Sequence, residues 1–208
     1  MIRIRSMTPA LAAAALGVLA IAPGAVASPP SPQVLNPAPP ALYTCKPLGA
    51  GTLCTGSVHE VKVSEEQGEL VCVTGDGFFL IHDNGFVDQS LTRTYNADGN
   101  LTSRVIHEKW GDTFWSNPLS GKTVPYTQTD KITTVLTVPG DFGSAVETTV
   151  GSNVYTDPAT HQKVLTNAGR TVFGADGSLE SRAGQQPFID AFVDGDLSVF
   201  DKVCAALS

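Results

Sequence analysis

The stretch Arg93-Thr94-Tyr95-Asn96-Ala97-Asp98-Gly99-Asn100-Leu101-Thr102-Ser103-Arg104 decides the fold of this chain. Two runs of β-type residues flank Asp98-Gly99, and glycine readily adopts the positive φ that a hairpin turn requires. A near copy runs from Arg170-Thr171 through Ala175-Asp176-Gly177-Ser178-Leu179 to Ser181-Arg182. A stacked-repeat protein needs about three or more units. The two copies therefore predict two similar hairpins in one antiparallel sheet.

The turn chemistry also predicts a pairing register. With Gly99 in the left-handed region, Tyr95 lies opposite Leu101 and Leu91 lies opposite Val105. The same register in the second copy places Phe173 opposite Leu179. An aromatic side chain facing an aliphatic one across two strands contributes about 0.2–1 kcal/mol.

Strand and turn signals recur along the chain from Thr52 to Arg182. We expect turns at Ser64–Glu69, His82–Gly85, Gly111-Asp112 and Pro139-Gly140. Pro187 ends this pattern, and apolar residues then recur at helical spacing, with Asp196 placed to cap a second helix. The predicted fold is all-β and mainly antiparallel. It is a meander of about ten strands, barrel-like or strongly curled, with a short C-terminal helical segment.

Three segments are expected. Residues 1–27 read as a signal peptide, with Arg3 and Arg5 before an apolar run and Ala25-Val26-Ala27 as a cleavage site before Ser28. Residues 28–42 read as a Pro-rich disordered linker, because six of these fifteen residues are proline. Residues 43–208 are long enough for a single β-rich domain with its own core.

Export and charge limit the partners. Removing residues 1–27 removes Arg3 and Arg5 and no acid, which takes the formal net charge from −7 to −9. An acidic chain is a poor partner for nucleic acid or an anionic membrane. We therefore expect a secreted, soluble monomer without a membrane association after signal cleavage. Its partner would be a small molecule, a glycan or a protein.

The cysteines Cys45, Cys54, Cys72 and Cys204 predict two disulfides, because the chain is expected to be exported and the count is even. Three pairings are possible. Cys45 with Cys54 would close a small hairpin. We prefer Cys54 with Cys72 and Cys45 with Cys204, because this pairing would anchor both chain ends.

Trp110, Phe114 and Trp115 crowd one predicted hairpin turn and are the candidate ligand-binding residues. Exposed together they would form a ligand or sugar platform, and the alternative is that they pack against one another. The four histidines have no ligand spacing, and the cluster of Asp190, Asp194 and Asp196 lacks the pattern of a calcium loop. No metal and no cofactor is expected.

The chain also contains Cys-x-Pro-x-Gly-x-Gly-Thr-x-Cys at 45–54, Thr92-Arg93-x-Tyr95-Asn96-Ala97-Asp98-Gly99, Pro139-Gly140-Asp141, Ala168-Gly169-Arg170, Pro187-Phe188 and Gly195-Asp196. This combination of motifs is similar to that of a group of uncharacterised secreted proteins of actinobacteria. The resemblance covers essentially the whole of residues 43–208. It implies export from a high-GC Gram-positive cell, and it implies no activity.

The chain contains no Gly-x-Ser-x-Gly elbow, no His-Glu-x-x-His and no phosphate-binding glycine loop. The leading hypothesis is therefore a secreted, non-enzymatic binding or interaction module. A secreted hydrolase with an unrecognised site is the first alternative, and two close carboxylates would favour it. A secreted inhibitor or toxin-like interaction protein is the other alternative.

Overall fold

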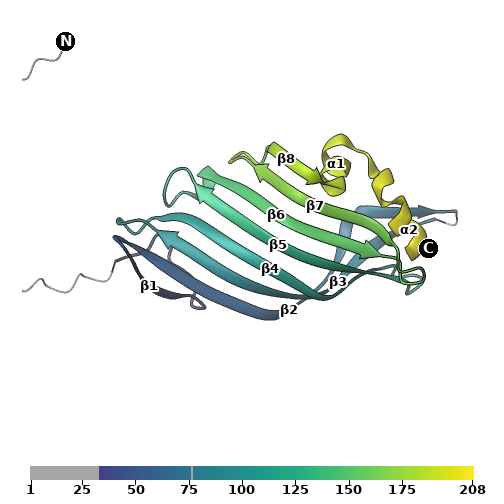
Figure 1. Ribbon diagram of the computed structural model, residues 1–208, viewed down its shortest axis with the longest axis horizontal. Helices are drawn as coiled ribbons and strands as arrows, with labels where there is room; N and C mark the ends of the chain where they lie inside the picture. Colours follow the sequence, from purple (N-terminus) through teal and green to yellow (C-terminus); the bar gives the residue numbers. More distant parts are fainter. Residues whose placement is uncertain (1–32, 76) are drawn as a thin grey trace, which may run out of the picture. The chain divides into compact units, whose positions relative to one another are not determined.

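The computed structural model describes residues 33–75 and 77–208, which form one antiparallel sheet followed by helices. Eight strands pair in chain order, each with the next (Figure 1). They are β1 (Thr44–Leu48), β2 (Gly51–Thr74), β3 (Gly77–Tyr95), β4 (Leu101–Ser116), β5 (Thr123–Leu136), β6 (Ala145–Thr156), β7 (Lys163–Phe173) and β8 (Leu179–Gln185). The short helices are η1 (Phe142–Ser144), α1 (Pro187–Asp194), η2 (Leu197–Phe200) and α2 (Asp201–Leu207).

Both Asp-Gly hairpins are confirmed as turns between neighbouring strands, β3 with β4 and β7 with β8. Gly99 has a φ of 82°, in the left-handed region that the turn requires. Tyr95 pairs with Leu101 and Phe173 with Leu179, as predicted. The predicted pairing of Leu91 with Val105 is wrong, because a register shift beside Tyr95 places Leu91 opposite Ile106.

The strands are longer and fewer than predicted. The expected turns at Ser64–Glu69, His82–Gly85 and Gly111-Asp112 all lie inside continuous strands. Register shifts mark all three of these places, because β2, β3 and β4 carry bulges there. Gly85 is needed for close approach, since a Cβ on it would lie 2.5 Å from Cγ2 of Thr113. The turn-forming residues at these places lie in bulges and do not end the strands. The sheet therefore has eight strands, where about ten were predicted.

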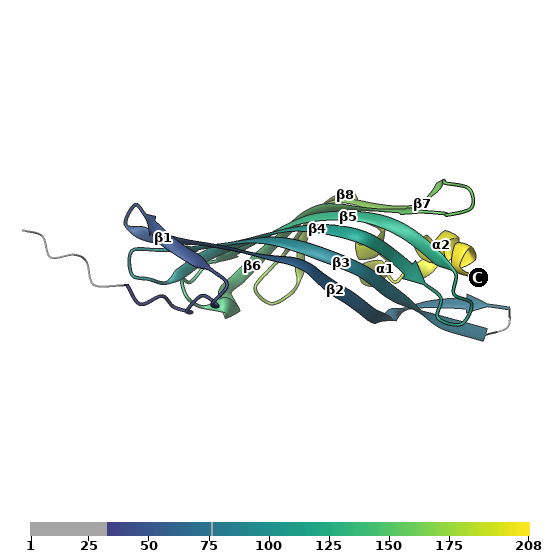
Figure 2. The same ribbon diagram turned by 90° about the horizontal axis from the view of Figure 1, so that it is seen from below.

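The sheet is mostly antiparallel as predicted, but it is open. In the described part of the chain β1 and β8 are its two edges and do not pair with each other, so the sheet is not closed and the predicted barrel-like form is not confirmed. Figures 1 and 2 show α1 and α2 together at one end of the sheet. The tip of the β2–β3 hairpin extends past the end of β4 beside α2, since pairing of β3 with β4 begins only at His82.

Two separate cores result. The larger one joins the sheet to the C-terminal helices and is called the helix-end core. Its buried members are Leu70, Cys72, Phe79, Ile81, Trp115, Val124, Tyr126, Tyr155, Leu165, Ala191, Phe200, Val203 and Leu207. The smaller one comprises Cys54, Tyr95, Leu101 and Leu136 and lies near the Asp98-Gly99 turn. Between them the same sheet face has no helical cover in the described residues, which leaves room for polar side chains.

Two disulfides are present as predicted, but the preferred pairing is wrong. Cys45 is joined to Cys54 and Cys72 to Cys204, with sequence separations of 9 and 132 residues. Cys45 lies directly opposite Cys54 on β1 and β2, which is why the short connection forms. Two disulfides are consistent with an extracellular protein. No helix in the described part is long and apolar enough to cross a membrane.

The predicted signal peptide, residues 1–27, lies outside the described residues, as does the first part of the predicted linker. The described linker residues 33–42 differ from a free spacer, because they are attached to the sheet. The backbone N–H of Asn36 donates to the carbonyl of Gly99 at 2.8 Å, and Leu101 N–H donates to the carbonyl of Asn36 at 2.8 Å. The Tyr95 hydroxyl donates to the carbonyl of Pro37 at 3.0 Å.

The two disulfides are expected to contribute unequally to stability. Loop-closure entropy alone predicts a loss of about 5 kcal/mol for Cys72→Ser/Cys204→Ser and of about 3 kcal/mol for Cys45→Ser/Cys54→Ser. Denaturant unfolding of the two double variants measures the difference. Equal losses, or a larger loss for the short loop, would contradict the expectation that loop length sets the contribution of each disulfide.

Candidate functional site

The predicted platform of Trp110, Phe114 and Trp115 does not form. Trp115 is only 3% exposed and belongs to the helix-end core. Its ring stacks on Phe188 of α1 at a centroid distance of 5.9 Å and packs against Tyr155 at 4.4 Å. Phe114 points to the opposite sheet face because successive strand residues alternate. Trp110 lies beside the β4 bulge and donates from Nε1 to Glu108 at 3.3 Å.

Polar side chains instead gather on the helix-bearing face where the cover of the helices ends. Gln89, Glu108, Asp130 and Gly151 are successive cross-strand partners on β3, β4, β5 and β6. Gln128, Asn153 and Asn167 form the neighbouring row on β5, β6 and β7. We call these side chains the acid–amide strip: Gln89, Glu108, Gln128, Asp130, Asn153 and Asn167.

Glu108 and Asp130 face each other directly across β4 and β5. Gln89 Nε2 donates to Glu108 at 2.7 Å, and Gln128 Nε2 donates to Asp130 at 2.6 Å. Burial raises the pKa of Asp130, and the nearby Glu108 carboxylate adds to this rise against the Gln128 hydrogen bond. Like charges directly opposite in a sheet destabilise it. Such a pair is typical of functional positions.

Asp83 is a third half-buried carboxyl on this face, nearer the helices. The hydroxyl of Tyr126 donates to it at 2.7 Å. Burial raises the pKa of Asp83 and outweighs the opposing effects of Tyr126 and the Trp115 indole. The Trp115 indole lies near enough to Asp83 to affect its pKa. Its buried Nε1 nevertheless makes no well-formed hydrogen bond. The carboxyl thus lies at the border between the aromatic core and the polar strip.

Gly151 allows the carboxyl of Asp130 to occupy its place. A Cβ on Gly151 would lie 2.7 Å from the carbonyl oxygen of Thr129 and would overlap Oδ1 of Asp130. A side chain there would therefore displace Asp130 and strain the backbone of β5. This close approach explains why a glycine stands in the middle of a long strand.

An open pocket lies between the tip of the β2–β3 hairpin and the C-terminal helices. Its volume is about 490 Å³. The apolar lining residues are Leu70, Val71, Val73, Ile81, Leu197 and Phe200, and Cys204 and Ala205 complete that wall. Ser198, Asp201 and Ser208 supply the polar groups. We call this the hairpin–helix pocket. Its size and apolar lining are typical of small-molecule sites, which span about 300–1,000 Å³.

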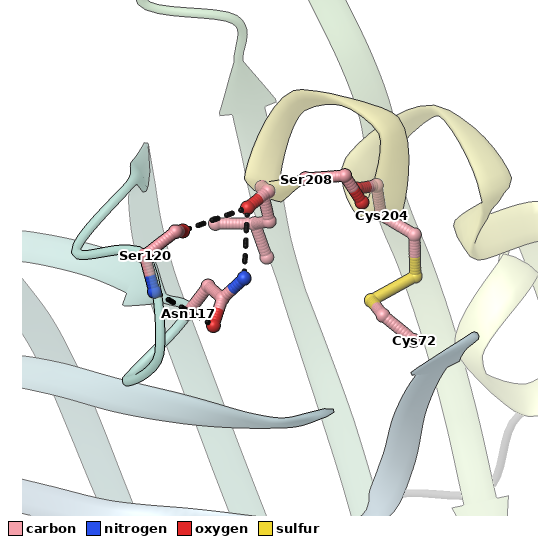
Figure 3. The surroundings of a disulfide bond; sticks show 6 residues. Cys72, Asn117, Ser120, Cys204 and Ser208 are labelled. Carbon is pink, nitrogen blue, oxygen red and sulfur yellow. Dashed lines mark hydrogen bonds between the residues drawn. A yellow bond between two sulfur atoms is a disulfide. The ribbon is translucent and has the colours of Figure 1, made fainter. Parts of the chain in front are cut away.

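The helix that forms one wall of this pocket is attached at two points. The Cys72–Cys204 disulfide joins α2 to the hairpin. The carbonyl of Leu207 accepts from Asn117 Nδ2 at 3.1 Å and from Ser120 Oγ at 3.3 Å (Figure 3). Asn117 is buried, so its hydrogen bond to α2 is shielded from water. The pocket walls are therefore held in place without a ligand.

The acidic cluster near the C-terminus has structural roles. Asp190 and Asp194 form ion pairs with Arg182 at 2.7 and 3.2 Å. Asp196 accepts from the backbone N–H of Ser198 at 3.1 Å, which confirms its predicted role as a helix cap. Among the described residues no group of three or more His, Cys, Asp or Glu side chains could hold a metal ion.

Sequence reasoning missed both sites for the same reason. Glu108-Lys109 and Asp130-Lys131 are recognisable acid–base dipeptides, and strand alternation alone places each acid and its lysine on opposite faces. Only the pairing register brings Glu108 next to Asp130. The pocket joins residues of β2 and β3 with residues of η2 and α2, more than one hundred positions later in the chain.

The Asp130 carboxyl predicts a stability change with pH. Its pKa is higher in the folded chain than its usual value of 3.8. Ionisation of Asp130 therefore destabilises the fold as the pH rises from the pKa of the unfolded chain through the pKa of the folded chain. Asp130→Asn should therefore be more stable than the wild type at neutral pH, by about 0.2–1 kcal/mol. The advantage should vanish below about pH 3.9. Thermal unfolding across pH measures it.

Asp157→Asn is the control of opposite sign, because backbone N–H groups of Ala159 and Thr160 lower the pKa of Asp157. Its ionised form is therefore favoured by folding, and the variant should be less stable than the wild type at neutral pH. A loss of stability in Asp130→Asn at neutral pH would contradict the interpretation of the carboxylate pair.

Comparisons with known proteins assign no family to this chain. No protein-family model matches it, and no curated protein and no solved structure shows a significant similarity. Function must therefore be argued from the geometry of the acid–amide strip and the hairpin–helix pocket.

Proposed function

We propose that this protein is an exported, non-enzymatic binding module that holds a small ligand with an apolar body in the hairpin–helix pocket. The observation that carries the proposal is the pocket itself, about 490 Å³ in volume and lined mainly by apolar side chains. An open apolar cavity with a few polar groups is the usual form of a small-molecule site. Aliphatic wall residues favour burial of hydrocarbon over recognition by hydrogen bonds.

The attachment of α2 supports a binding role. A wall held by the Cys72–Cys204 disulfide and by two hydrogen bonds to Leu207 does not need to be ordered when a ligand enters. Preorganisation lowers the entropic cost of binding. Val73 and Leu197 at the pocket mouth are 79% and 51% exposed, so apolar surface is accessible before any ligand arrives.

Export is part of the proposal. It is supported by the charged and apolar segments before Ser28 and by the two disulfides, which persist in oxidising compartments. A module outside the cell would meet its ligand in the medium or in the cell envelope. The acid–amide strip is not required for this role.

The test is titration of the full chain with Nile red, a neutral dye that fluoresces in apolar sites. Saturable binding is expected, and Leu197→Glu or Val73→Glu should weaken it about tenfold, because a charge at the mouth opposes burial of an apolar body. Leu48→Glu is the matched control, since Leu48 is 52% exposed on β1 and Leu197 is 51% exposed. Equal binding by all four proteins, or none by the wild type, would overturn the proposal.

The carboxylate pair favours one second candidate, a hydrolase acting at the acid–amide strip. Asp130, whose pKa burial raises, would serve as the general acid and Glu108 as the general base. The two side chains project from directly paired positions on β4 and β5.

Hydrolysis of neutral polysaccharides followed by release of reducing ends tests this candidate. Glu108→Gln and Asp130→Asn should each lower the rate at least about a hundredfold, in line with general acid–base catalysis. Glu147→Gln is the control, because Glu147 lies on the same face but is paired with Arg104 at 3.6 Å. Activity that survives in both variants, or no activity in the wild type, would exclude hydrolysis of such substrates at this strip.

A further inference from the structure

The wall of the hairpin–helix pocket is apolar from base to mouth. Leu70, Ile81 and Phe200 at its base are only 7%, 1% and 5% exposed. Val73 and Leu197 continue the apolar surface to the solvent. An occupant that fills this space therefore has an apolar body, because each methylene group that it buries adds to its affinity. The polar end of such a molecule would remain at the mouth.

The polar groups that line the pocket differ in whether they already have a hydrogen-bond partner. The hydroxyl of Ser198 donates to Asp196 at 2.6 Å, and the hydroxyl of Ser208 donates to the carbonyl of Cys204 at 2.7 Å. The carboxylate of Asp201 has no hydrogen bond and no ion pair within the described part of the chain. Asp201 therefore offers the pocket an unused acceptor with a negative charge.

No positive side chain balances this charge in the lining that the structure describes. Lys202 follows Asp201 in α2, but adjacent residues of a helix do not face each other. The chain as a whole carries a formal net charge of −7, which adds a weak attraction for cations and a weak repulsion for anions. The pocket thus combines an apolar wall with one uncompensated carboxylate.

We infer that the ligand of the hairpin–helix pocket is a cationic amphiphile, with an apolar body against Leu70, Ile81 and Phe200 and an ammonium head beside Asp201. This inference rests on the proposed binding function and narrows it to one ligand class. The opposite charges lie at the exposed mouth, so their attraction sets selectivity among head groups and the apolar wall sets affinity. The attraction between Asp201 and the ammonium head weakens as the salt concentration is raised.

The test compares three ligands with the same decyl chain: decyltrimethylammonium, decyl sulfate and decyl maltoside. Each is titrated below its micelle concentration, with displacement of Nile red from the full chain as the readout. The ammonium compound should bind about two- to fivefold more tightly than the neutral maltoside, and the sulfate more weakly than both. Asp201→Asn should lose most of the preference for the ammonium compound over the maltoside.

Glu180→Gln is the control for overall charge. Glu180 is exposed on β8 and its loss changes the net charge by the same amount, so the cation preference should persist in this variant. A preference that persists in Asp201→Asn, or that falls equally in both variants, overturns the inference. In either case, binding of the maltoside would still support the proposed binding function of the pocket. Failure of all three decyl compounds to bind would overturn the proposed function as well.

Discussion

The burial of Trp115 beneath the C-terminal helices is the contact on which the rest of the structure depends. An open antiparallel sheet has two faces and needs a second layer to cover one of them. Here that layer is only a short segment, and it covers one end. Trp115, Tyr155, Phe188 and Phe200 pack ring against ring, with centroids 4.4–6.2 Å apart in the contacts of Trp115. This aromatic contact places the helices beside the hairpin tip.

The limited extent of the helical layer explains both candidate sites. Where the layer meets the projecting β2–β3 hairpin, the two surfaces do not fill the space between them, and the hairpin–helix pocket remains. Where the layer stops, the sheet face carries Glu108 and Asp130 in place of apolar residues. The disulfide between Cys72 and Cys204 strengthens the junction at the pocket, because it closes a loop of 132 residues.

Local signals predicted local structure well. The Asp98-Gly99 and Asp176-Gly177 turns and the helix cap at Asp196 were predicted from the sequence, because each depends on residues within a few positions. Other local signals misled. Asn84-Gly85 and Gly111-Asp112 are typical of turns, but they lie at a bulge between β3 and β4, where a close contact with Thr113 requires Gly85.

The sequence by itself determined the class of this protein: a β-rich chain built from hairpins, with two disulfides and a helical ending. These properties follow from composition, alternation and turn chemistry, which act over short distances along the chain. The tertiary structure alone decided the disulfide pairing, the burial of Trp115, the meeting of Glu108 with Asp130 and the pocket. Each of these depends on register or on the docking of residues far apart in the chain. A shift of one residue would turn every side chain of a strand to the other face.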